Sequence, residues 1–572
     1  MPTKESSTKL RTIVEIVLLT LLFFVYAGDM APMVNEAHYL VKAKNFWDAA
    51  WCQNDLFTAS GKAHTTFYFL FGWPTKFLSL SATAWIGRVA GWLLLAFGLQ
   101  RLTARVIPGE FASMVVAIIW IAGVEHGNLA GEWVVGGIEA KVPAYGFVLL
   151  ALSEMVDRRW NRVWQLLGIA SAFHVLSGGW SVIAASLAWL MTEHKRPDGK
   201  AFFTPALFVG GAIALFGLVP AFYLTIGVPR EDTVAAAEIY SYFRIKHHLL
   251  PADFQIWWFV RHGILIALTV MLYTLTLKSA SAIPDSQRQQ LRLLLWFTMG
   301  AVLIAFAGLV VGSLPAYAPE LAAKLLRYYW FRLTDAIVPL MLAILAASAV
   351  YRQPIFFCKP ADSASTDAAS AIKSPTNGAS KNGPPITPKP SHWGNTGSWL
   401  VLLASATFFA MSTIKRSHLG IPPSASHKLL GWAPDATVQQ QRAGFADWLA
   451  VCDWVRESTA KDEVLLTPRH QQSFKWYAER AEIVNWKDVP QDAESLLEWD
   501  HRFADVFPRR LGRVRVTIKY ADLKRYRDKY GVRFMVVDRR ITGPNLPLVQ
   551  LYPVGKEINA TYAVYELPHA DR

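Results

Sequence analysis

Two polar loops, each following an apolar segment, hold the residues of this chain best suited to chemistry. The first reads GDMAPMVNEAHYLVKAKNFWDAAWCQNDLF and includes Asp29 and Glu36, and the second reads EHGNLAGEWVVGGIEAKVPAYG and includes Glu139. A carboxylate beside an apolar helix can act as a general base toward a hydroxyl group, and carboxylates from two loops can share a divalent cation. We therefore take Asp29, Glu36 and Glu139 as candidate catalytic residues, with the cofactor left open between none and a divalent cation. The polar side chains nearby are candidate substrate contacts: His38, Glu132 and Lys141.

Each loop also has a simpler interpretation. An amphipathic helix at the membrane surface with a solvated polar face explains Glu36 and His38, and spacing alone favours it. In the second loop, a local Glu139–Lys141 pair that neutralises charge is the alternative.

Two further segments combine basic and aromatic residues. EIYSYFRIKHHLLP contains Arg244, His247 and His248, and KLLRYYWFRLTD contains Arg327 and Arg332. The planar fork of donors on an arginine suits a phosphate or diphosphate, so these residues are candidate substrate contacts. Ordinary anchoring by Arg, Tyr and Trp at a membrane interface is the alternative. Two adjacent histidines do not make a metal site.

The elements that must position these loops are membrane-spanning helices. The chain has 572 residues, of which 53% are hydrophobic and only 17% charged, below the share of about a quarter that is usual in soluble proteins. A helix needs about 20 mostly apolar residues to cross a bilayer. The sequence predicts about eleven spans, at 12–28, 83–101, 111–124, 142–156, 163–175, 178–191, 202–226, 255–277, 291–312, 332–350 and 398–414.

The basic residues predict the orientation of these spans. If the amino terminus is cytoplasmic, the short turns on its side of the membrane carry clusters of Lys and Arg, as the positive-inside rule requires. The outer segments are then 29–82, 125–141, 227–254, 313–331 and everything after 414. The apolar stretch 66–80 would invert this pattern as a span, so we expect it to be a juxtamembrane or re-entrant helix. The first segment also fits a cleaved signal peptide, an alternative that leaves the later topology unchanged.

The carboxy-terminal part predicts a separate soluble unit. Residues 353–397 are rich in Ser, Ala, Pro and Asn and predict a disordered cytosolic linker. Beyond the last span, DWLAVCDWVRE has helical periodicity, EVLLTP and RFMVVD predict buried strands, and LKRYRDKYG predicts a helix ending before Gly531. The predicted architecture is a polytopic α-helical membrane domain with a small extracytoplasmic α/β domain. Its parts are a membrane domain 1–352, the linker, the span 398–414, a connector 415–439 and the α/β domain 440–572.

Several function classes are disfavoured. The net charge of +14 lies mainly between apolar segments, which indicates topology and not a nucleic-acid site. There is no Walker loop, no GxGxxG after a strand, no HExxH and no GxSxG. Cys52 and Cys452 both fall on the predicted outer face, where a disulfide between them can form, whereas Cys358 is predicted to be cytosolic.

Short motifs in chain order resemble the GT-C type membrane glycosyltransferases, which include protein O-mannosyltransferases and aminoarabinose transferases. Asn35–Tyr39 resembles the acidic element after their first span, Arg88 the arginine of the second span, and Glu139–Tyr145 the Glu-Ala-Arg-Pro-Tyr element of bacterial members. The end of the chain, with Trp454–Arg456 and Tyr530–Asp538, resembles the outer domain of large bacterial members. The segments GEWVVGG and FHVLSGGW also resemble those of a group of planctomycete-type membrane proteins.

The resemblance implies transfer of a sugar from a polyprenyl-phosphate carrier to an acceptor at the outer face of the cytoplasmic membrane. By position, Glu36 matches the second acid of the first-loop element, Glu139 the second-loop acid and Lys141 the cation after it. Asn35 stands where the family usually has its base, and an amide cannot accept a proton. Asp29 or Glu36 would then take over the role, or the chain is not catalytic in this way. The resemblance implies a membrane lipid and a lipid-linked sugar as partners, no nucleic acid, and does not indicate a protein partner.

Two other functions remain open from the sequence. A transporter or lipid flippase predicts paired charges at mid-membrane depth and an internal repeat of spans, and no clear repeat is present. A non-catalytic receptor or scaffold would use the outer domain for binding, and the amide at position 35 is a small point in its favour.

Overall fold

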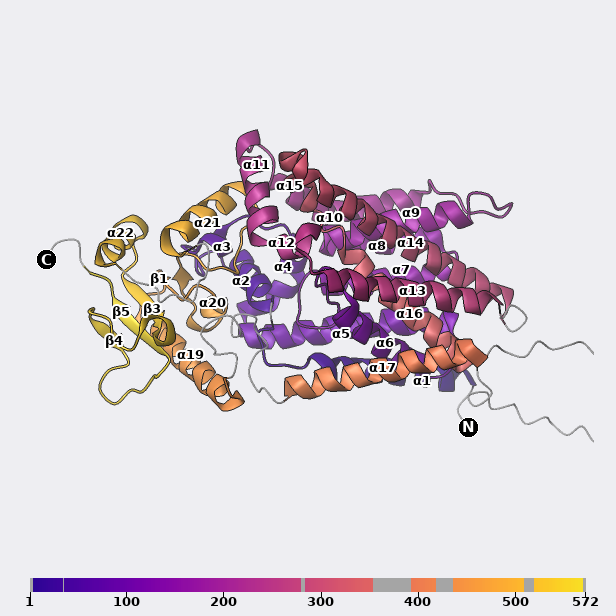
Figure 1. Cartoon of the computed structure of the whole chain (residues 1–572), viewed down its shortest axis with the longest axis horizontal. Helices are drawn as coiled ribbons and strands as arrows, with labels where there is room; N and C mark the ends of the chain where they lie inside the picture. Colours follow the sequence, from indigo (N-terminus) through magenta and orange to yellow (C-terminus); the bar gives the residue numbers. More distant parts are fainter. Residues whose placement is uncertain are drawn as a thin grey trace, which may run out of the picture.

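The computed structural model describes residues 4–33, 35–278, 283–352, 392–417, 436–508 and 519–568. A long bundle of roughly parallel helices forms one end of the molecule, and a small domain with a β-sheet forms the other (Figure 1). The amino-terminal helix lies in the bundle and the chain ends in the small domain. The linker predicted at 353–397 and the connector predicted at 415–439 fall largely outside the described residues.

Each of the eleven predicted spans corresponds to a helix of the bundle. Eight are long and apolar enough to cross a membrane, whereas α6, α7 and α8 have only 16, 16 and 14 residues. The chain is therefore a multi-pass membrane protein, as its composition predicts. The eleven helices are α1 (Lys4–Ala27), α5 (Leu80–Val106), α6 (Ala112–Gly127), α7 (Lys141–Val156), α8 (Trp160–Phe173), α9 (Val175–Thr192), α10 (Pro205–Tyr223), α13 (Ile256–Lys278), α14 (Asp285–Ser313), α16 (Arg332–Tyr351) and α17 (His392–Ser417).

Small residues let the central helices approach closely. A Cβ atom on Gly168 of α8 would lie 2.2 Å from the backbone oxygen of Gly210 of α10, and one on Gly98 of α5 would lie 2.9 Å from the backbone oxygen of Gly146 of α7. Glycine is therefore needed at these crossings, as in many membrane helix pairs. Helix α16 lies at the centre of the bundle, where nearly all of its side chains are buried.

Short helices cover one end of the bundle. The predicted juxtamembrane stretch 66–80 forms α4 (Thr65–Gly72) and the 3-10 turn η1 (Trp73–Lys76), and eight helical residues are too short to cross a bilayer. The other elements at this end are α2 (Glu36–Trp47), α3 (Leu56–Ala59), α11 (Arg230–Glu238), the π-helical turn η2 (Ile239–Arg244), α12 (Lys246–Leu249), η3 (Pro251–Asp253), η5 (Leu314–Ala316) and α15 (Pro319–Leu326).

The opposite end of the bundle carries the arginines that predicted the cytoplasmic turns. Arg105 pairs with Glu154 at 2.8 Å, and Arg158 pairs with Glu193 at 2.6 Å. Each pair joins neighbouring helix ends and leaves further basic side chains nearby.

The small domain is an α/β domain built on one five-stranded sheet of order β2-β1-β3-β5-β4. Strands β1, β2 and β3 are parallel, and β5 and β4 complete the sheet in antiparallel fashion. The two predicted strands are β1 and β3, and the two predicted helices are α19 and α22, the latter ending at Gly531 with φ of 66°. The elements are α19 (Val438–Ser458), β1 (Val464–Leu466), α20 (Phe474–Ala478), β2 (Ala481–Glu482), α21 (Ala493–Val506), α22 (Tyr520–Tyr530), β3 (Phe534–Asp538), α23 (Arg539–Thr542), β4 (Gln550–Tyr552) and β5 (Tyr562–Glu566).

Cys52 and Cys452 are both buried and free, so the disulfide considered between them is not formed. Cys452 packs in the domain core beside Trp448 and Val455, while Cys52 lies in the first loop. Cys358 lies outside the described residues.

Candidate active site

The second loop is fixed by buried groups on α13 and α16. Asp335 accepts hydrogen bonds from the backbone N–H groups of Leu129 and Ala130 at 2.6 and 2.9 Å. His262 lies 2.9 Å from the carbonyl oxygen of Gly127 through Nδ1. These contacts hold the loop between α6 and α7 against the membrane helices, so that its acidic residues have defined positions.

A chain of polar contacts then runs through the acids of this loop. The Lys141 ammonium, at the first residue of α7, lies 2.9 Å from a carboxylate oxygen of Glu132 and 2.9 Å from one of Glu139. The other oxygen of Glu139 accepts a hydrogen bond of 2.8 Å from the Asn35 amide. The amide of the first loop is therefore in contact with the acid of the second loop. An amide there supports a single carboxylate where an aspartate would place two beside each other.

Arg332, at the first residue of α16, extends the chain of contacts. It pairs with Glu132 at 2.8 Å and lies 2.9 Å from Nε2 of His174, the N-cap of α9. The ring of His174 stacks on that of His64 with centroids 5.2 Å apart, and Tyr39 lies 5.4 Å from His64.

Three helices begin at this cluster. The amino-terminal ends of α7, α9 and α16 carry Lys141, His174 and Arg332 respectively. Each helix terminus presents the positive end of a helix dipole, which favours a bound anion. Together with the two cationic side chains, this arrangement suits a negatively charged substrate group.

The sequence candidate Glu36 has a different environment. Its two carboxylate oxygens accept hydrogen bonds from Arg88 at 2.6 and 2.5 Å and from the backbone N–H groups of Ile138 and Met33 at 2.8 and 2.7 Å. Glu36 is 1% exposed and Arg88 is fully buried. These contacts join α2, α5 and the second loop, and Arg88 also donates to the backbone oxygen of Asp29 at 2.5 Å. The geometry gives Glu36 and Arg88 the role of positioning the first loop on the second.

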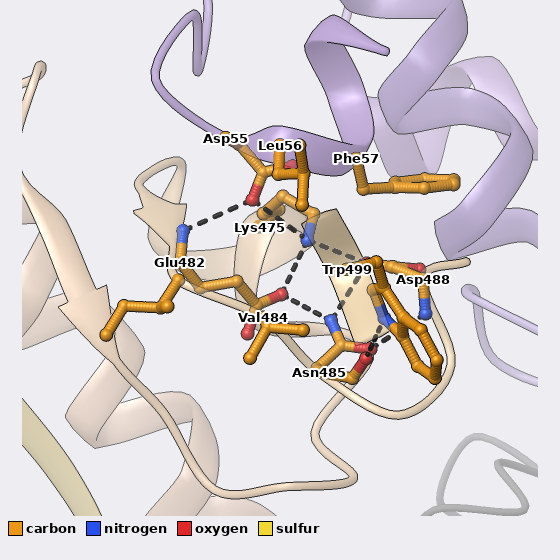
Figure 2. A pocket seen from close by; sticks show the side chains of 10 residues that line it. Asp55, Leu56, Phe57, Lys475, Glu482, Val484, Asn485, Asp488 and Trp499 are labelled. Atoms are coloured by element: carbon orange, nitrogen blue, oxygen red, sulfur yellow. Dashed lines mark hydrogen bonds and ion pairs between the residues drawn. The ribbon is translucent and has the colours of Figure 1, made fainter. Parts of the chain in front are cut away.

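The small domain is joined to the first loop through a buried lysine. Lys475 lies 3.3 Å from Asp55 of the loop, and 2.5 and 2.6 Å from Glu482 and Asp488 of its own domain. Figure 2 shows these groups around a small pocket, with Asn485 donating to both Glu482 and Asp488. The lysine side chain is 1% exposed, so these ion pairs are shielded from water.

His38, a predicted substrate contact, belongs to this junction and lies 3.3 Å from Asp488. Burial lowers the pKa of His38, so the ring is neutral at physiological pH.

The segment Asn485–Asp488 links this junction to Arg244 of η2. Asn485 accepts hydrogen bonds from the backbone N–H groups of Lys487 and Asp488 at 2.8 and 2.9 Å. The ring of Trp486 lies 4.5 Å from the Arg244 guanidinium, which also donates to the Trp486 carbonyl at 2.6 Å. The backbone around Lys487 is therefore held from both sides.

The structure brings together Glu132, Glu139, Lys141 and Arg332, while Arg244 lies at the junction with the small domain. The remaining basic candidates lie elsewhere around the loops. His248 lies 2.5 Å from the carbonyl of Ala130 in the second loop, and the ring of the exposed His247 is tilted against that of His248. Arg327 donates to the carbonyl of Gln491 in the small domain at 3.3 Å.

Sequence reasoning missed the contributions of the small domain, Lys475, Trp486 and Lys487, because no motif marks them. It also missed His64, whose partner His174 was visible as a lone histidine in FHVLSGGW.

A divalent cation does not find its ligands in this arrangement. The described residues contain no group of three or more His, Cys, Asp or Glu side chains placed to hold a metal ion. The two acids closest to such a role, Glu132 and Glu139, are bridged by the Lys141 ammonium.

Comparisons with known proteins give a domain match and a structural likeness. Residues 446–506, which include the segment Asn485–Asp488, match a family described as a domain of unknown function, DUF6798. No curated protein matches the sequence. Among solved structures, the chain is similar to the crystal structure of ArnT from Cupriavidus metallidurans bound to undecaprenyl phosphate. The identity is 13%, the TM-score 0.41, and 99% of each chain is covered.

Proposed function

We propose that this protein is a GT-C-like glycosyltransferase that moves a sugar from a polyprenyl-phosphate carrier to an acceptor hydroxyl. The observation that carries the proposal is the cluster at the start of α7, α9 and α16, where the carboxylate of Glu139 lies among cationic groups and helix amino termini. A carboxylate can accept the proton of the acceptor, and the cations can stabilise a departing phosphate. The motif resemblance implies the same donor class.

Glu139 is better placed to act as the base than the other acids. Each of its oxygens has one described partner, Lys141 on one and the Asn35 amide on the other. Glu36 instead receives four hydrogen bonds, and Glu132 lies between two cations. In this mechanism the acceptor oxygen attacks the anomeric carbon while Glu139 takes its proton. The bond between that carbon and the phosphate oxygen breaks, and the electron pair leaves with the lipid phosphate.

Tyr39 would contact the sugar or the acceptor in this reaction, and Arg332 would contact the phosphate. Burial and the neighbouring Glu139 raise the pKa of Tyr39, so its hydroxyl stays protonated and can donate to the sugar or to the acceptor. Arg332 keeps a planar guanidinium at the start of α16, which suits the phosphate oxygens.

Glu139→Gln tests the proposal. The amide keeps the size of the side chain and its contact with Asn35 but cannot take a proton, so transfer from a polyprenyl-phosphate-linked sugar should fall about 10²- to 10⁴-fold. Transfer is measured on purified protein with radiolabelled lipid-linked sugars and on glycans in cells. Glu457→Gln, an exposed glutamate of the small domain, is the matched control. Full transfer by the Glu139 variant, with normal folding, would remove this mechanism.

The proposed site requires one orientation in the membrane. The amino terminus would be cytoplasmic in the cell membrane, and the outer loops and small domain would face the other side. A reporter fused after residue 568 should therefore be active only outside the cytoplasm, and one inserted at 197–199 only inside. Reporters that place residues 125–141 and the small domain on opposite faces would contradict the assignment.

A further inference from the structure

Lys487 is a half-buried amine without a bonded partner among the described residues. Its ammonium forms no hydrogen bond or ion pair with any residue that the structure describes, although its backbone is fixed by Asn485. The side chain is half-buried, so one part of it remains accessible. Burial, with the nearby Arg244 guanidinium, lowers the pKa of Lys487 to about 8. A cation held in this way without an anion is costly, which points to a ligand that is absent from the free protein.

The charges around Lys487 leave an excess of positive charge. The groups that act on it are Arg244, Glu139, Asp488 and Lys141. Glu139 is already paired with Lys141, and Asp488 with Lys475. Arg244 donates through Nε to the carbonyl of Trp486 and forms no ion pair within the described residues. Within the described part of the chain, Lys487 and Arg244 are therefore two cations without a carboxylate partner.

The position of Lys487 relative to the bilayer indicates which class of anion can reach it. Lys487 directly follows Trp486, which contacts Arg244 of η2, one of the short elements that cover the end of the helix bundle. The ends of membrane helices mark the level of lipid headgroups. An anion at that level, reached from a domain outside the bundle, is the headgroup of a lipid.

We propose that Lys487, together with Arg244, binds the phosphate of the lipid-linked substrate, so that the small domain supplies part of the active site. The inference rests on the proposed function for the identity of the lipid. An ammonium and a guanidinium with free N–H groups match phosphate oxygens. The ion pairs of Lys475 fix the segment Asn485–Asp488 on the first loop. They thereby also fix the position of Lys487 for binding.

Binding of polyprenyl phosphate to the full-length protein in detergent tests this proposal. Losing one charge-assisted contact should weaken binding about 10- to 100-fold in Lys487→Gln. Lys487→Arg should retain most of the affinity, because it keeps the charge and the donors. Lys461→Gln, an exposed lysine of the same domain, should bind as the wild type does. Equal affinity in Lys487→Gln and wild type, or no rescue by arginine, would overturn the proposal.

Two further measurements are needed. One distinguishes a lipid phosphate from free phosphate as the ligand, and the other distinguishes failure of this inference from failure of the proposed function. Inorganic phosphate is the second probe, and if it competes as well as the lipid at equal concentration, a lipid ligand is ruled out. Weaker lipid binding in Lys487→Gln without any sugar transfer by the wild type would preserve this inference and end the proposed function. Normal sugar transfer together with normal lipid binding in Lys487→Gln would overturn this inference and leave the proposed function standing.

The pH dependence gives a readout that a structural role would not move. Because the pKa of Lys487 is about 8 in the free protein, its ammonium is present below that pH and lost above it. Affinity should therefore decline between pH 7.5 and 9.5, where the phosphate monoester is already fully ionised. Lys487→Arg should show no such decline, and Lys487→Gln should be weak throughout. A decline of the same size in all three proteins would assign the effect to another group.

Discussion

Lys475→Met should destabilise the junction between the small domain and the first loop by about 3–5 kcal/mol, the usual cost of removing one partner from a buried ion pair. Methionine fills a similar volume, so the loss is electrostatic. It leaves Asp55, Glu482 and Asp488 buried together without the ammonium that now lies within 3.3 Å of each. Hydrogen exchange and limited proteolysis of the purified protein would report the change, as faster exchange in residues 35–60 and easier release of the domain.

The same variant has a defined pH dependence. Burial raises the pKa of Glu482 even with Lys475 present, and removing the cation raises it further. A carboxyl group with a raised pKa in the folded state adds stability at low pH, and this stability is lost as the pH rises through the raised value. The defect of Lys475→Met should therefore be smaller at pH 5 than at pH 8.

Lys461→Met is the control for this experiment, because Lys461 is exposed. Adding Glu482→Gln to Lys475→Met removes one of the uncompensated charges and should recover part of the loss. Wild-type exchange and proteolysis in Lys475→Met would show that the domain is held by its apolar contacts alone.

The spans and the α/β domain could be predicted from the sequence because their signals are local. Each span is an apolar run, and each of the strands β1 and β3 is a short buried run beside turn residues. Strand β2 has only two residues and strand β4 three, which is too short for a pattern of alternation to appear. The short length of α7 and α8 is visible in the sequence as well, because the apolar runs 142–156 and 163–175 both fall short of 20 residues.

The acidic part of the site could be predicted and its partners could not. Glu139 and Lys141 are visible as acid and base in one loop, and sidedness places that loop beside the first. The amide that holds Glu139 comes from Asn35, 104 residues earlier, and Lys475 reaches Asp55 across 420 positions. Contacts at such separations are set by the packing of whole elements, so no local spacing reveals them.

The sequence also does not distinguish the roles of the two acidic residues. Glu36 and Glu139 are equally acidic in the sequence, and only the arrangement of donors tells them apart. The arginine that distinguishes them, Arg88, lies in α5 among apolar residues, where a charge needs a partner. The resemblance marked both Arg88 and Glu36, but the contact between them appears only in the fold.

Arg88→Leu should be among the most damaging substitutions in the membrane domain. Arg88 is fully buried and donates to both oxygens of Glu36 and to the backbone of Asp29. Without it, a carboxylate that is 1% exposed keeps only two backbone donors, and the expected loss is about 3–5 kcal/mol. Less protein should be recovered in folded form, measured as the monodisperse fraction in size-exclusion chromatography after mild heating.

The double variant Arg88→Leu with Glu36→Leu separates charge from packing. Replacing both members of a buried ion pair by apolar residues costs less than removing one, so the double variant should be more stable than Arg88→Leu. Because Ile138 and Met33 would lose their acceptor, it should still be less stable than the wild type. If Glu36 only positions the loops, Glu36→Gln should reduce transfer far less than Glu139→Gln does at equal amounts of folded protein. Equal losses in the two glutamine variants would return the catalytic role to the first loop.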